Sequence, residues 1–367
     1  MSLYLTGFGT AVPQHSITQA DAAEVGARFA SADAKRSNTF RALYRRTGVD
    51  KRHSVLLEGS EGAPMDRQSF YPGARGGDDP GPSTEVRMRR YEAEAPALAE
   101  AAAAAALENA DLDPRELTHL ITVSCTGFFA PGLDALLIDR LGLLSSVERT
   151  HIGFMGCHGS LNGLRVASSF AGADPGARVL VSSVELCSLH FAYGSDPELI
   201  VANALFSDGA AAVVGVASEP GRSEGEGPWR VLATGTLLMP ESTDAMSWRI
   251  TDHGFRMTLS AAVPSLIGAH LSGWLEQWLG RHGLGLLDVA TWAVHPGGPR
   301  LLSAVRDAVG LTDETLAASR EVLAEYGNMS SATVLFILER LRSSGAPRPC
   351  VALAFGPGLV VEAVLLG

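Results

Sequence analysis

Three short glycine-rich segments of the sequence carry side chains suited to thioester chemistry. Cys157 stands in Gly-Cys-His-Gly, His295 begins His-Pro-Gly-Gly, and Asn328 stands in Gly-Asn-Met-Ser-Ser. A cysteine attacks an acyl group as the thiolate, and a nearby imidazole can accept its proton. An amide and an imidazole together can stabilise an enolate or an oxyanion. These residue types therefore favour the formation of carbon–carbon bonds from thioesters, with these three side chains as the catalytic candidates.

Each candidate also has an ordinary structural interpretation. A cysteine in an apolar chain is usually inert filling. Cys157, however, follows a glycine and precedes an expected helix of small residues, whose positive end favours a thiolate. The neighbouring His158 is a poor base, because adjacent side chains on a helix diverge by roughly 100°. His295 ends an expected strand and is the better base. Asn328 could cap the helix that follows it, which need not exclude catalysis.

The same segments resemble the signatures of the type III polyketide synthases of the bacterial type, the chalcone-synthase-like enzymes of the thiolase superfamily. The matching runs are Trp-Ala-Val-His-Pro-Gly-Gly-Pro at 292–299, Tyr-Gly-Asn-Met-Ser-Ser at 326–331, Phe-Gly-Pro-Gly at 355–358 and Ala-Leu-Phe-Ser-Asp-Gly-Ala-Ala-Ala at 204–212. The resemblance covers nearly the whole chain in the same order. It implies a homodimeric acyltransferase in which Cys157 takes a starter acyl group from acyl-CoA. His295 and Asn328 would stabilise the enolate formed from malonyl-CoA.

The resemblance also implies a substrate cavity. Phe206 matches a family position that gates the passage from the CoA tunnel, and Met257 falls where the plant enzymes carry a second gating Phe. Trp248 falls where those enzymes have a small residue, and Ala130 falls where they reach a Met across the dimer interface. The other residues expected at the cavity are Cys125, Thr126, Cys187, His190, Ser330, Gly356 and Pro357. For Cys125 and Cys187, plain core packing is the alternative.

A basic segment stands out in this acidic chain. The net charge is −11, yet residues 35–52 contain seven Lys or Arg residues and a single acid, Asp50. Such a patch could meet the phosphates of CoA, and the alternative is a solvated helix face. The expected CoA contacts are Arg41, Arg45, Arg46, Lys51 and Arg52.

Apolar runs typical of strands buried on both faces alternate with helical patterns, which argues for an α/β fold. The expected strands are 118–123, 177–184, 210–216, 289–294 and 350–355, and the expected helices are 97–109, 161–170, 301–309 and 332–342. Residues 59–83 read as a surface loop, and 217–228 could link two halves.

The two halves of the sequence echo one another. Asn328 follows His295 at nearly the same distance as Cys157 follows Cys125, and each pair spans a strand end and a helix start. This pattern is typical of an internal duplication. It agrees with the five-layered, thiolase-like αβαβα fold that the resemblance implies. We expect one half, 1–220, to carry the nucleophile and the other, 221–367, to carry His295 and Asn328.

Composition limits the other function classes. An acidic chain is a poor general nucleic-acid binder. The four cysteines form no CxxC pair, so no structural zinc or other metal is expected, nor any bound cofactor. No signal peptide or membrane-spanning run is evident, which makes a cytoplasmic location the expectation. The order Cys, His, Asn also occurs in papain-like proteases, but their motif around the cysteine is absent.

Three alternatives stay open within and around the family. The smaller or more flexible residues Ala130, Cys125 and Met257, with Trp248 closing another side, favour a narrow channel and a fatty acyl-CoA starter. The product would be an alkylresorcinol or alkylpyrone. Malonyl-CoA could instead serve as both starter and extender and give a small polyhydroxylated aromatic. A single condensation of the ketoacyl-synthase III type is another alternative, and a non-catalytic scaffold is a third.

Overall fold

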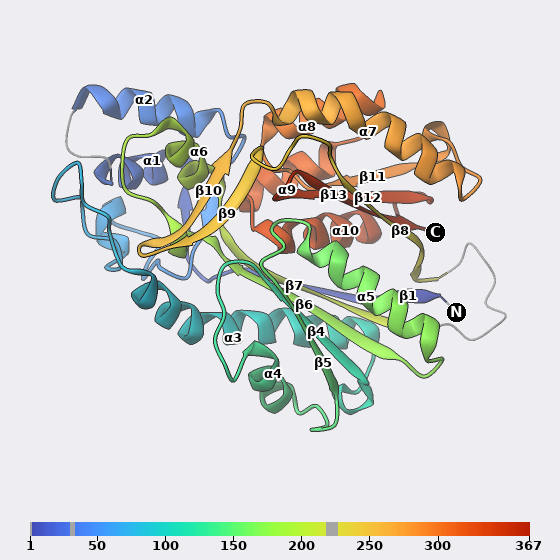
Figure 1. Ribbon diagram of the computed structural model, residues 1–367. Helices are drawn as coiled ribbons and strands as arrows, with labels where there is room; N and C mark the ends of the chain where they lie inside the picture. Colours follow the sequence, from blue (N-terminus) through green and yellow to red (C-terminus); the bar gives the residue numbers. More distant parts are fainter. Residues whose placement is uncertain (1, 30–33, 218–226) are drawn as a thin grey trace.

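The computed structural model describes residues 2–29, 34–217 and 227–367 (Figure 1). Within them, nine strands form one mixed sheet in the order β11-β12-β13-β8-β1-β7-β6-β4-β5. The strands of the first half are β1 (Leu3–Ala11), β4 (His119–Ser124), β5 (Glu148–Gly153), β6 (Arg178–Leu186) and β7 (Asp208–Ala217). Those of the second half are β8 (Trp229–Leu238), β11 (Thr291–Val294), β12 (Cys350–Gly356) and β13 (Val360–Leu366).

The two halves of this sheet repeat one topology. In the first half β4 runs parallel to β6, and β6, β7 and β1 then pair antiparallel in turn. In the second half β11 runs parallel to β12, and β12, β13 and β8 pair antiparallel in turn. The halves join where β1 pairs briefly with β8, at Tyr4–Arg230 and Leu5–Trp229. The expected internal duplication is therefore present in the strand order and direction.

The helices complete five layers. Helices α5 (Gly159–Ala173) and α10 (Thr333–Ser343) lie between the half-sheets and contact strands of both (Figure 1). Their buried side chains join those of both half-sheets in one apolar core. Helices α3 (Thr84–Ala110) and α4 (Leu133–Leu141) cover the outer face of the first half-sheet. Helices α7 (Val263–Gly280) and α8 (Pro299–Val309) cover that of the second. The αβαβα arrangement is confirmed.

The central helices explain the sequence pattern around the candidate residues. Every residue from 159 to 164 in α5 and from 333 to 338 in α10 is buried. A helix enclosed on all sides must be apolar or small all round, and it cannot show an amphipathic stripe. Both helices begin next to a catalytic candidate, so the site lies in the middle layer, where the halves meet.

Further elements surround the site. They are α1 (Gln19–Arg28), α2 (Ala34–Arg45), α6 (Pro197–Leu205), α9 (Ala317–Tyr326), the strand pair β2 (Ser16–Thr18) and β3 (Lys51–His53), and the hairpin of β9 (Met246–Thr251) and β10 (Gly254–Leu259). The expected strands and helices all appear. The expected surface loop, 59–83, contains only a short 3-10 helix, Pro64–Arg67. The expected boundary at 220 and most of the linking segment lie outside the described residues.

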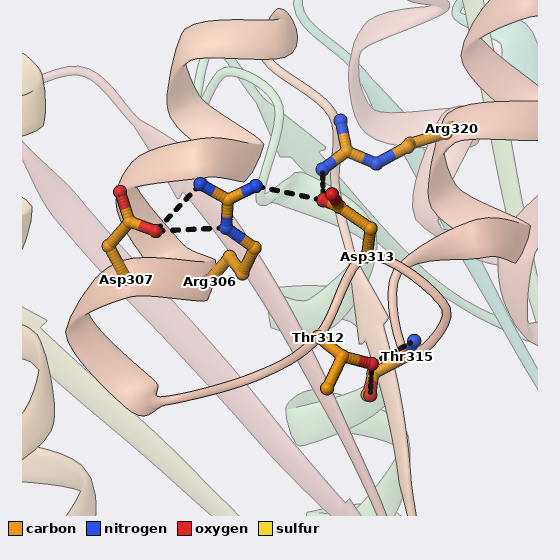
Figure 2. Close-up of polar contacts among 6 residues, drawn as sticks. All are labelled: Arg306, Asp307, Thr312, Asp313, Thr315 and Arg320. Carbon is orange, nitrogen blue, oxygen red and sulfur yellow. Dashed lines mark hydrogen bonds and ion pairs between the residues drawn. The ribbon is translucent and has the colours of Figure 1, made fainter.

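An ion-pair network ties α8, which follows His295, to α9, which leads to Asn328. Arg306 of α8 bonds to Asp307 and to Asp313, and Arg320 of α9 bonds to the same Asp313 (Figure 2). Exposed pairs of this kind contribute little singly, typically about 0–1 kcal/mol. The shared Asp313 carboxylate links the two helices across the loop between them. In the described part of the chain, no helix is both long and apolar enough to cross a membrane.

Candidate active site

Cys157 lies in the tight turn that enters α5. Gly156 before it has φ +78°, and a Cβ there would come within 2.4 Å of Pro357, so only glycine fits. The turn leaves the Cys157 side chain half-buried on the wall of a cavity. The Ser330 hydroxyl lies 3.5 Å from its sulfur. The nucleophile candidate is thus the cysteine with access to a cavity at a helix start.

His295 directly follows β11. Its backbone N–H donates to Leu353 O at 2.8 Å and so continues the pairing with β12. Its side chain is fully buried, and neither ring nitrogen has a hydrogen-bond partner within the described residues. Buried polar atoms are nearly always paired, so an unpaired imidazole needs an explanation. A ring held with both nitrogens free is available to exchange a proton or to bind an oxygen.

Asn328 is held by its backbone between two residues of another segment. Its N–H donates to Leu205 O at 3.0 Å, and its carbonyl accepts from Ser207 N at 2.9 Å. The side-chain Oδ1 accepts from Ser330 N at 2.8 Å, which closes a turn leading into the short helix Ser330–Ala332, whose N-cap is Met329. Its Nδ2 is buried and, in the described structure, has no partner. This turn uses the amide oxygen and leaves the amide donor free.

Burial governs the protonation states of Cys157 and His295. It raises the pKa of Cys157 to about 12, while the nearby Ser330 hydroxyl and Asn328 amide act in the opposite direction. Burial, with a smaller contribution from nearby His158, lowers the pKa of His295 to about 3. Both groups are therefore neutral at pH 7 before substrate binds. A neutral imidazole can accept the thiol proton and can donate one N–H bond.

The cavity gathers most of the expected pocket residues. Phe191 and Phe255, which the sequence analysis did not single out, also line it, and Phe255 stacks on His190 with ring centroids 4.2 Å apart. Trp248 donates from Nε1 to Cys125 O at 2.7 Å, which fixes its ring on the wall. The nine expected residues around the cavity are Cys125, Thr126, Cys187, His190, Phe206, Trp248, Met257, Ser330 and Pro357.

Two expected pocket residues do not line this cavity. Ala130 is exposed on a surface loop, so in a single chain it cannot shape the pocket. Gly356 is buried against His158, where an added Cβ would lie 2.4 Å from the imidazole ring. Its neighbour Pro357 reaches the cavity instead.

A buried carboxylate behind the cavity was missed at the sequence level. Glu185, on β6, is fully buried and accepts hydrogen bonds from Cys125 N, from Thr126 Oγ1 at 2.7 Å and from Ser331 Oγ. Burial raises its pKa, and these donors oppose that shift. It fixes residues from both halves of the chain beside Cys157. A lone acid in an apolar strand was the signal available in the sequence.

Family models match almost the whole chain. The N-terminal domain of chalcone and stilbene synthases matches residues 3–220, and the C-terminal domain matches residues 231–367. The chain belongs to the chalcone and stilbene synthase family. It is a type III polyketide synthase, an enzyme of the acyltransferase class, and the papain-like alternative is wrong.

Relatives of this synthase agree with that assignment. It is 41% identical to a 1,3,6,8-tetrahydroxynaphthalene synthase of Streptomyces peucetius over 71% of the chain and 70% of the relative. It is 32% identical to a 3,5-dihydroxyphenylacetyl-CoA synthase of Streptomyces toyocaensis over 99% and 89%. It is 34% identical to polyketide synthase 37 of Dictyostelium discoideum, of which it spans only 9%.

Solved structures of type III polyketide synthases also match this chain. The crystal structure of PKS-I from the brown alga Ectocarpus siliculosus matches with a TM-score of 0.91 at 30% identity, over 100% of this chain and 98% of that one. The C-terminal type III polyketide synthase domain of Steely1, a type I/III hybrid from Dictyostelium, matches with a TM-score of 0.88 at 27% identity, over 100% and 99%. The likeness extends over both halves of the synthase.

The basic residues of the synthase do not form a single group. The side chains of Arg45, Arg46 and Lys51 are exposed, and exposed Arg41 pairs with Glu24 at 3.3 Å. The side chains of Lys35 and Arg36 lie outside the described residues. These exposed cations are near the end of α2, at one side of the molecule.

Arg52 corrects the expectation that all five residues face CoA. Its side chain is only 4% exposed, and Nη1 donates to the carbonyl oxygens of Asn203 and Phe206. Successive side chains of a strand point to opposite faces, so Lys51 of β3 faces solvent and Arg52 faces inward. Burial lowers the pKa of Arg52, and a guanidinium still stays charged at pH 7.

Proposed function

We propose that Cys157, His295 and Asn328 carry out decarboxylative Claisen condensation of malonyl-CoA with an acyl-CoA starter. The observation that carries the proposal is the set of free nitrogens: within the described residues, both ring nitrogens of His295 and Nδ2 of Asn328 are buried without partners. The Asn328 amide lies near the Cys157 thiol, and that thiol is on the cavity wall. Such free nitrogens suit an anion that exists only during the reaction. The relatives' names agree with polyketide formation.

Each step follows from these groups. His295 accepts the Cys157 proton, the sulfur attacks the starter carbonyl, and CoA leaves as the thiol. Malonyl-CoA then loses CO2, and the electron pair of the broken C–C bond forms an enolate that His295 and Asn328 hold by N–H bonds. The enolate carbon attacks the acyl-cysteine, which releases the Cys157 thiolate and gives a β-ketoacyl-CoA. Repeated extension precedes ring closure.

The starter that we propose is a fatty acyl-CoA. After extension, the chain would cyclise to an alkylresorcinol or an alkylpyrone. The lining is mainly apolar and includes Leu199, Met246 and Met257, which suits an acyl chain. A second cavity lies beyond Phe191 and Phe206, which line both cavities. Movement of either ring would give a linear chain more room.

A second candidate is priming by malonyl-CoA itself, to give a small polyhydroxylated aromatic. The likeness to a 1,3,6,8-tetrahydroxynaphthalene synthase favours it. We also propose that Arg41, Arg45, Arg46 and Lys51 meet CoA phosphates, and that the synthase acts as a cytoplasmic homodimer without a bound cofactor.

Mass spectrometry of products separates the candidates. The synthase is incubated with malonyl-CoA alone and with malonyl-CoA plus acyl-CoA starters of two to sixteen carbons. We expect alkylated rings whose mass follows the starter, and little product without one. A full-rate aromatic product from malonyl-CoA alone would overturn the fatty-acyl starter. A single C2 addition would instead indicate chemistry of the ketoacyl-synthase III type.

A further inference from the structure

We infer that Arg52 is a positioning residue for the condensation reaction. It holds Phe206 in place and, through the main chain of residues 205–207, it also holds Asn328. The inference rests on the proposed role of Asn328. It assigns to Arg52 a function inside the protein, and it leaves the CoA phosphates to its exposed neighbours.

The guanidinium of Arg52 caps the end of α6. The carbonyls of Asn203 and Phe206, at and just beyond the last turn, accept hydrogen bonds from Nη1, the second at 3.0 Å. The last carbonyls of a helix have no partners within the helix. A cation is also favourable at that end of the helix dipole. Arg52 therefore fixes the backbone at the point where the chain leaves α6 and places Phe206 on the cavity wall.

Two aromatic rings hold the guanidinium in place. Its central carbon lies 5.6 Å from the ring centroid of Tyr44, in α2, and 5.6 Å from that of Phe191. Such cation–π contacts strengthen when the cation is removed from water, as it is here. In the described residues no carboxylate forms an ion pair with Arg52. Its hydrogen-bond acceptors are the two main-chain oxygens and the Tyr44 hydroxyl, and the nearby charge of Asp208 favours the charged guanidinium.

The same backbone carries Asn328. Leu205 O and Ser207 N, on either side of Phe206, make the two hydrogen bonds that hold the Asn328 backbone, and Phe206 and Asn328 form a parallel bridge. Arg52 also packs on the residue before Asn328. Gly327 has φ +74°, and a Cβ there would lie 3.1 Å from Arg52 Cγ. Arg52 thus supports the Asn328 turn from two directions.

This arrangement predicts that Arg52 affects the step that needs Asn328 more than the step that needs only Cys157. A misplacement of about 1 Å at a reacting group can cost about 10²-fold in rate. Decarboxylation requires the Asn328 amide at the enolate oxygen. Transfer of an acyl group to Cys157 does not require decarboxylation. The ratio of the two rates is therefore the quantity to measure.

The experiment compares Arg52→Lys and Arg52→Gln with the neighbouring exposed variant Lys51→Gln. Release of CO2 from malonyl-CoA gives the first rate. Intact-protein mass spectrometry of Cys157 acylation by hexanoyl-CoA and by the hexanoyl N-acetylcysteamine thioester gives the second. We expect Arg52→Lys to lower decarboxylation at least tenfold and acylation less than threefold, with Arg52→Gln more severe. Lys51→Gln should raise the KM of both CoA thioesters by the same factor.

Several outcomes would overturn the inference. One is a folded Arg52→Lys protein in which both rates change equally or not at all. Another is a result in which the Arg52 variants, like Lys51→Gln, only raise the KM of both CoA thioesters by the same factor. That result would make Arg52 a CoA contact. If neither Arg52 variant folds, Tyr44→Leu decides, because it removes one ring from the guanidinium away from the Cys157 cavity. Tyr44→Leu should lower the ratio of the decarboxylation rate to the Cys157 acylation rate at least threefold, and an unchanged ratio would contradict the inference.

Asn328→Ala separates this inference from the proposed function. If Asn328→Ala loses decarboxylation while Arg52→Lys keeps it, only the role of Arg52 is wrong. If Asn328→Ala decarboxylates at the wild-type rate, the proposed function itself fails.

Discussion

Cys157 differs from the other cysteines in exposure and in the groups around its sulfur. Cys125, Cys187 and Cys350 are buried, and burial raises the pKa of each. Cys157 is half-buried and has a hydroxyl and an amide that favour its thiolate. Because the free thiol is neutral at pH 7, its reactivity should depend on a proton acceptor.

Alkylation tests this dependence. At pH 7.5, brief treatment with iodoacetamide should label Cys157 before the other three cysteines, and His295→Gln should slow that labelling at least tenfold because the acceptor is lost. Peptide mapping by mass spectrometry gives the rate at each cysteine. Loss of activity that follows labelling of Cys125 would contradict the assignment of the nucleophile. An unchanged rate in His295→Gln would remove His295 as the base.

Sequence predicted some of these residues better than others, for physical reasons. Cys157, His295 and Asn328 each stand beside glycines whose conformation or close approach the site requires, as Gly156 and Gly327 show. Such local constraints are visible in a motif. Arg52 is part of a three-residue strand, too short for a polar–apolar alternation to indicate which side chain faces inward.

At the scale of elements, burial decided what could be predicted. Strands β4, β6 and β12 and helices α5 and α10 are enclosed by other layers, so they read as continuous apolar or small-residue runs. The half-exposed hairpin of β9 and β10 has no such pattern and was not predicted. It nevertheless supplies Trp248, Phe255 and Met257 to the cavity. The part of the site that sets substrate choice is thus the part least visible in the sequence.

The exposed cations near the end of α2 give a prediction at this scale. Replacing Arg45 and Arg46 together by Gln should raise the KM for CoA thioesters by about three- to tenfold, because charge-assisted hydrogen bonds to phosphate are lost. N-acetylcysteamine thioesters lack those phosphates and should be nearly unaffected. Steady-state kinetics with both substrate types measures the difference, and the control is Arg281→Gln, at an exposed arginine just after α7. Equal effects on both substrates would indicate structural damage.

At the scale of the whole molecule, two neutral buried histidines make stability depend on pH. Burial lowers the pKa of His190 and of His295 from 6.5 to about 3. Between pH 6.5 and 3, the unfolded chain therefore binds protons at these histidines that the folded chain does not bind. The stability present above pH 6.5 is lost as the pH falls toward 3. Within that window, each histidine should lower the free energy of unfolding by about 1.4 kcal/mol for every unit by which the pH falls. Asp208, whose pKa burial raises to about 6, acts in the opposite direction over part of it.

Urea unfolding at pH 7.5 and pH 5.5 measures this dependence. The unfolding midpoint should fall between the two conditions, and His190→Gln should lessen the fall, whereas His282→Gln, at an exposed position, should not. The same pH dependence in His190→Gln and in the wild type would contradict burial of a neutral His190.

The central claim is that two halves of a duplicated fold bring a thiol from one half to an amide and an imidazole from the other. The most direct test is the rate of CO2 release from malonyl-CoA by Asn328→Ala, measured beside Cys157 acylation in the same protein. Loss of one preorganised donor should reduce decarboxylation by about 10²–10³-fold, while Cys157 still accepts a starter acyl group. Asn328→Asp keeps an oxygen that can accept from Ser330 N and loses the N–H donor, so it should fail in the same way. Decarboxylation at the wild-type rate in Asn328→Asp would contradict the account.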